Sequence, residues 1–118
     1  MSKIFYDDLV DLSKVEKKIN KVARSEEEKH ELWKTVDEIV HHRVMGCILS
    51  RLPREHHEDF LDKFRRRPHD EGLFEYLKEK IKDDIKFFIK EEALKLGYEL
   101  LGELSVGLMR EELDKKKE

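Results

Sequence analysis

The run V-M-G-C-I-L-S-R-L-P at residues 44–53 is the least polar stretch in the first two-thirds of a chain in which 45% of the residues are charged. Before this run, apolar residues fall on one face of a helix: Leu32, Trp33, Val36, Ile39, Val40, Val44 and Cys47. From Met45 to Leu52 apolar residues occur on nearly every side, so we expect other helices to enclose this end. Pro53 predicts the end of the helix, because proline disfavours the α conformation in the residue before it.

The composition of the whole chain favours helices. It has only 5 Gly and 2 Pro, and its abundant Lys, Glu and Leu lose little side-chain freedom in a helix. A length of 118 residues fits one domain. We therefore predict an all-α bundle of four to five helices over residues 1–118, with a long carboxyl-terminal helix and a frayed charged tail at 113–118.

Spacing and capping signals place the helices more closely. Apolar residues at positions 9, 12, 15, 19 and 22 predict a helix over 7–23, and Ser25 followed by three glutamates predicts the start of the next one. A third helix is expected over 53–66. After a loop at 65–72, with Asp70 as a candidate N-cap, a fourth begins, and residues 82–84 predict a kink or break before the last helix. The residues expected in the core are Val44, Cys47, Ile48, Leu52, Phe60, Phe64, Leu77 and Ile81.

The block 43–89 carries a characteristic spacing of apolar residues. It reads R-V-x4-L-x-x-L, then an acidic helix with phenylalanine, then L-x-x-Y-L-x3-I before a long final helix, carried by Arg43, Val44, Leu49, Leu52, Phe60, Leu73, Tyr76, Leu77 and Ile81. This block resembles a family of small, all-helical bacterial domains of unknown function. The resemblance implies an all-α fold and carries no activity across. The glycine-bearing final helix and the histidine pairs depart from the family pattern.

The stretch 94–109 carries more apolar surface than one face of a bundle can bury, because its polar residues keep to one narrow strip. The surplus predicts a partner, with a second copy of the chain favoured over another protein or a membrane interface. The expected interface is Leu94, Tyr98, Leu101, Leu104, Leu108 and Met109. Glycines at 97, 102 and 107 predict close backbone packing or local breaks, because each costs roughly 1 kcal/mol inside a helix. We predict a non-catalytic interaction or scaffold module that self-associates through this helix.

Arginines around the third expected helix offer an alternative function. Guanidinium groups bind phosphates bidentately, and a basic patch is possible from Arg51, Arg54, Arg65, Arg66 and Arg67. Acidic residues within the same helix dilute the patch, and no aromatic residue is interleaved to stack on bases. The net charge of −3 also creates no general attraction to polyanions. A nucleic-acid-associated accessory protein is therefore the second hypothesis, and nucleic acid is not the expected partner.

A metal-dependent enzyme is the third hypothesis. Glu38 and His41 have the E-x-x-H spacing of di-iron helical bundles, which also need a second such motif and two further glutamates facing it. Solvated surface histidines are the expected state, so we predict no metal, cofactor, catalytic residue or small-molecule substrate. The single cysteine, Cys47, cannot form an intrachain disulfide and favours a reducing, cytoplasmic location. No signal peptide and no transmembrane segment are expected.

Overall fold

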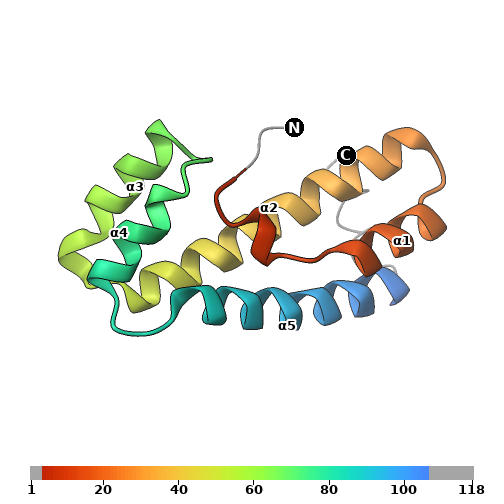
Figure 1. The fold of residues 1–118 in the computed structure, drawn as a ribbon. Coiled ribbons are helices and arrows are strands. Elements are labelled where there is room, and N and C mark those ends of the chain that lie inside the picture. Colours follow the sequence, from red (N-terminus) through yellow and green to blue (C-terminus); the bar gives the residue numbers. More distant parts are fainter. Residues whose placement is uncertain (1–3, 107–118) are drawn as a thin grey trace.

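The computed structural model describes residues 4–106 and consists of five α-helices joined by short loops. They are α1 (Ser13–Val22), α2 (Glu26–Arg51), α3 (His57–Arg66), α4 (Gly72–Lys80) and α5 (Ile85–Val106). Figure 1 shows α5 running alongside both α1 and α2, while α3 and α4 form a hairpin at the far end of α2. The predicted all-α bundle with a long carboxyl-terminal helix is confirmed.

The ends of the longest helices follow the local sequence signals. The Ser25 hydroxyl accepts a hydrogen bond from the Glu28 N–H at 3.1 Å, which satisfies one of the free donors at the start of α2. Leu52, directly before proline, has an extended ψ of 129° and ends α2. Ile81 also has an extended backbone and ends α4. The Asp84 carboxylate accepts a hydrogen bond from the Phe87 N–H at the start of α5, so the two helices are separate.

Two predicted helices begin later than expected. The segment predicted as one helix over 7–23 is a 3₁₀ turn at Asp7–Leu9, an extended stretch and then α1, because Val10 is extended and the Asp11 carboxylate accepts from the Ser13 N–H. The helix predicted over 53–66 starts as a 3₁₀ turn after Pro53, whose ψ of 139° is not helical, and becomes α3 only at His57. Both differences come from local backbone conformations that apolar spacing does not report.

The core runs the length of the bundle. Six of the eight residues predicted for it are buried: Val44, Ile48, Leu52, Phe60, Leu77 and Ile81. Phe64 is half-buried against the core. Cys47 is also only half-buried, and Gly46 and Ser50 beside it are exposed. The expectation that the end of α2 is enclosed on every side is therefore wrong, because α3 and α4 cover only part of it.

The amino-terminal segment with Phe5 and Tyr6 packs into the core beside the hairpin of α3 and α4. Phe5 is only 3% exposed, and its ring lies within 6.3 Å, 5.9 Å and 5.0 Å of the rings of Phe60, Phe64 and Phe74. Its N–H donates to the Pro68 carbonyl at 2.8 Å. The next residue, Tyr6, is also buried. Neither residue belongs to the predicted core, so this segment is an element that sequence periodicity missed.

Candidate interaction surface

Helix α5 carries two separate apolar stripes. The first faces α1 and α2 and is buried: Ile85, Ile89, Ala93, Leu96, Leu100 and Leu104. The second consists of Phe87, Leu94, Tyr98 and Leu101, which follow one another at spacings of seven, four and three residues. At about 100° per residue, the second stripe lies roughly 140° around the helix from the first. No single packing partner covers both stripes.

The second stripe faces solvent over much of its length. Leu94 is 58% exposed, Tyr98 is 62% exposed and Phe87 is 53% exposed, whereas Leu101 is partly buried against the core. Isolated exposed apolar residues are ordinary, but side chains repeating at helical spacing on one face form the kind of surface that a partner covers. This surface, defined by Phe87, Leu94, Tyr98 and Leu101, is the outer stripe of α5.

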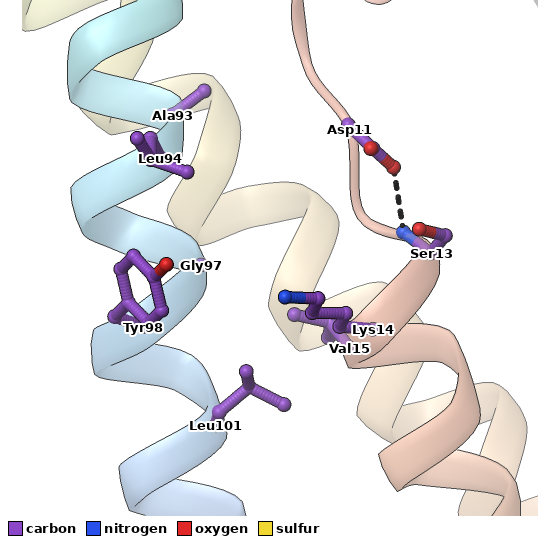
Figure 2. Close-up of a pocket in the computed structure, with 9 residues that line it drawn as sticks. All are labelled: Asp11, Ser13, Lys14, Val15, Ala93, Leu94, Gly97, Tyr98 and Leu101. Carbon is purple, nitrogen blue, oxygen red and sulfur yellow. Dashed lines mark hydrogen bonds between the residues drawn. The ribbon is translucent and has the colours of Figure 1, made fainter.

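A hollow lies beside the outer stripe, between α5 and the start of α1. Its volume is about 150 Å³, and its walls come from Asp11, Ser13, Lys14, Val15, Ala93, Leu94, Gly97, Tyr98 and Leu101. Figure 2 shows Leu101 pointing from α5 toward α1, and the Lys14 side chain extending from α1 toward α5. The floor of the hollow is largely apolar, and its charged residues, Asp11 and Lys14, lie on the α1 side.

The predicted interface residues fall into three groups. Leu94, Tyr98 and Leu101 lie together on the outer stripe and line the hollow. Leu104 is only 5% exposed and belongs to the buried stripe, so a partner has no access to it in this fold. Leu108 and Met109 lie outside the described residues. Phe87 was not predicted, although its position seven residues before Leu94 was the signal that would have found it.

The glycines of α5 do not mark tight packing. A Cβ atom added at Gly97 or Gly102 would meet no atom within 4 Å, and the helix continues through both positions. The expectation of close packing or a helix break is therefore wrong for these two residues, and Gly107 lies outside the described chain. Gly97 instead lies on the wall of the hollow, where the missing side chain widens it.

The predicted basic patch is divided. The Arg51 guanidinium stacks on the Phe88 ring, with its Cζ atom 3.5 Å from the ring centre. Arg54 and the triplet Arg65, Arg66 and Arg67 are exposed at opposite ends of α3, and Arg66 pairs with Asp62 at 3.0 Å. The five arginines therefore do not form one continuous surface.

Arg43 links α2 to α5 on the side away from the hollow. Its guanidinium lies 2.8 Å from the Glu99 carboxylate and 3.6 Å from that of Glu92. The hydrogen bond with Glu99 is the main cause that raises the Arg43 pKa. The pair is open to water, so its contribution to stability is small. Arg43 therefore forms a water-accessible ion pair between α2 and α5.

His41 is the histidine that contacts the amino-terminal segment. His41 Nδ1 lies 3.4 Å from the Tyr6 hydroxyl, and burial lowers the His41 pKa while raising that of Tyr6 to about 12. The sequence also contains a second E-x-x-H motif that the prediction missed, Glu27 with His30. It lies on α2 itself, about three turns before Glu38, so the two motifs cannot face each other. Within residues 4–106, no three His, Cys, Asp or Glu side chains are grouped to hold a metal ion.

Burial also raises the pKa of the Cys47 thiol, which keeps it in its less reactive protonated form. Among the helices that the structure describes, none combines the length and apolar character needed to cross a membrane. No protein-family model, curated protein or solved structure matches the chain. The resemblance of residues 43–89 to a bacterial domain family therefore stays an expectation.

Proposed function

We propose that this protein is a non-catalytic protein–protein interaction module that self-associates through the outer stripe of α5. The observation that carries the proposal is the exposure of Leu94 and Tyr98, two large side chains one turn apart beside an apolar hollow. Covering such side chains removes apolar surface from water, which contributes about 25 cal/mol for each Å² buried. The stripe runs along about four turns of α5, so one partner lying along this face of the helix can cover all of it.

The spacing of the outer stripe supports a helical partner. Intervals of seven, four and three residues are those of the a and d positions in a heptad, along which two helices pack with interlocking side chains. A second copy of α5 presents the same stripe and can meet it in a symmetric pair. Self-association therefore needs no surface beyond the one that the fold exposes.

Light scattering on size-exclusion fractions of the full-length protein tests the proposal. We expect a mass above that of one chain at micromolar concentration, and a monomer for the double variant Leu94→Ser, Tyr98→Ser. The control is Lys95→Ser, a change of a 67% exposed side chain on the same helix but outside the stripe. A monomeric wild-type protein at all concentrations, with circular dichroism showing a folded chain, would rule out self-association.

Surface variants are the proper test because α5 cannot be shortened without damage to the core. Leu96, Leu100 and Leu104 are each at most 5% exposed and belong to the buried stripe. A chain that ends near Leu94 loses all three, and each large-to-small loss in a core costs about 2–5 kcal/mol. The mass of this shortened chain in solution would reflect unfolding, so it would not test whether the interface has been lost.

A further inference from the structure

The hollow between α1 and α5 has a basic border. Lys14 lines it, and Lys17, Lys18 and Lys21 follow on the same side of α1 at helical spacings of three, four and seven residues. Within residues 4–106, none of these lysines forms an ion pair. On α5, Lys90 lies one turn before Leu94 and extends this border. The apolar floor is therefore bounded by a row of lysines along its α1 side.

Few carboxylates balance this row. Asp11 lines the hollow and stays ionised, because its hydrogen bonds with Ser13 and, to a smaller extent, the charge of Lys14 lower its pKa. Glu92 and Glu99 pair with Arg43 on the α2 side of the helix. Glu91 lies three residues before Leu94 and about 120° around the helix from Gly97, on the flank of the outer stripe that faces away from α1. Lysines of α1 and Lys90 therefore outnumber Asp11 around the hollow, which leaves an excess of positive charge beside it.

The charge selects among possible occupants of the hollow. Two copies of the chain bring two lysine rows to one interface, which costs electrostatic free energy. A partner helix with acidic side chains beside its apolar ones places carboxylates against the lysines of α1, so this repulsion between like charges does not arise. A hollow of about 150 Å³ holds a group of about the size of benzene, so it accepts one large apolar side chain of a partner.

We infer that the hollow between α1 and α5 binds an acidic amphipathic helix of a partner protein, in competition with a second copy of the chain. The inference rests on the proposed function, because both use the outer stripe. A partner helix laid along α5 sets one apolar side chain against Gly97 and Leu101 and others against Leu94 and Tyr98. Its carboxylates then lie along the lysines of α1. A bilayer presents a flat surface with no protruding anchor, so a concave site between two helices favours a protein helix.

Fluorescence anisotropy with a labelled probe peptide tests the inference on the full-length protein. The probe is a helix of about 18 residues, long enough to form in water, with leucines at intervals of three and four and glutamates beside them. The control peptide keeps the leucines and replaces every glutamate by lysine. We expect the acidic peptide to bind at least 10-fold more tightly than the basic one, more weakly at high salt, and to shift the protein from oligomer to monomer in light scattering.

Matched variants locate the binding site. Lys14→Glu with Lys17→Glu and Lys21→Glu should weaken binding of the acidic peptide at least 10-fold, and Leu94→Ser with Tyr98→Ser should abolish it. Lys95→Ser, on the other flank of α5, should leave it unchanged. Circular dichroism confirms that each variant is folded, which is expected because none of these side chains is buried.

Each contrary result has a distinct meaning. Equal affinity for the two peptides, or an unchanged affinity in the triple lysine variant, would overturn the inference. A wild-type protein that self-associates but does not bind the acidic peptide would overturn the inference and leave the proposed function standing. If it does neither, both are wrong. A third outcome is that the wild-type protein co-sediments with vesicles of phosphatidylcholine and phosphatidylserine, the Leu94 and Tyr98 variant does not, and no peptide binds. That result would show that the partner of the outer stripe is a membrane and not a protein helix.

Discussion

Gly97 and Gly102 lie just over one turn apart on α5, and neither position is needed as glycine for the fold described. An added Cβ meets open space at both, while glycine costs roughly 1 kcal/mol relative to alanine in a helix because its unfolded chain is more flexible. We expect Gly97→Ala and Gly102→Ala each to raise the free energy of unfolding by about 0.5–1 kcal/mol. Urea unfolding followed by circular dichroism measures the change.

The two substitutions should differ in association. Gly97 is on the wall of the hollow and Gly102 is not, so a methyl group at 97 narrows the site that we propose for a partner. Gly97→Ala should therefore weaken self-association or peptide binding while it stabilises the monomer, and Gly102→Ala should only stabilise. Equal binding by both variants would show that the hollow takes no part in association.

His41 gives the stability of the fold a dependence on pH. Burial and the neighbouring His42 lower the His41 pKa in the folded protein below the unfolded value of about 6.5. Between these two pKa values the unfolded chain binds more protons, so the free energy of unfolding falls as the pH drops below about 6.5. We expect a smaller fall between pH 7.5 and 5.5 in His41→Gln than in the wild type, measured by urea unfolding. Exposed His30→Gln is the control, and the same reduced fall in that variant would refute the assignment.

The start of helix α2 depends on a local capping interaction. Its first turn is capped by the Ser25 hydroxyl, and Glu26, Glu27 and Glu28 face the positive end of the helix dipole. Ser25→Ala removes the acceptor and should lower the free energy of unfolding by roughly 1 kcal/mol. Ser25→Asp supplies another acceptor and should restore most of it. A loss in the aspartate variant as large as in the alanine variant would mean that the cap is not the cause.

Signals of this kind explain which elements were predictable. Ser25, Pro53 and residues 82–84 act on their own backbone neighbours, so the sequence predicts the bounds of α2 and the break before α5. The extended stretch after Leu9 was missed because the apolar spacing of residues 9–22 continues through it, although Val10 is not helical. Periodicity reports which side chains face inward, and it does not report where the backbone leaves the helix.

For the molecule as a whole, the sequence predicts an excess of apolar surface on α5 but not how the fold divides it. Leu94 and Tyr98 lie on a different face of α5 from Leu104, and only the positions of α1 and α2 decide which of the two faces is buried. Likewise, only the packing of α1 against α5 brings Lys14 to the hollow. The site depends on tertiary contacts that a helical pattern does not contain.

The same dependence on tertiary contacts holds for Phe5, which connects the hairpin of α3 and α4 to the rest of the fold. Its ring contacts Phe60 and Phe64 on α3 and Phe74 on α4, and its N–H bonds the loop between them. Phe5→Leu keeps an apolar side chain but loses the aromatic pairs, each worth about 0.5–1.5 kcal/mol. We expect the amides of α3 and α4 to exchange hydrogen faster in this variant, while those of α1 and α2 change little.

Ile19→Val provides the matched comparison, because Ile19 is fully buried on α1 and this change costs a similar 0.5–1.5 kcal/mol. If the hairpin opens on its own, its exchange should respond to Phe5→Leu and much less to Ile19→Val. Hydrogen exchange measured by mass spectrometry resolves the two regions. Equal acceleration over all five helices in both variants would mean that the chain opens only as one unit, and that Phe5 stabilises the whole bundle and not the hairpin in particular.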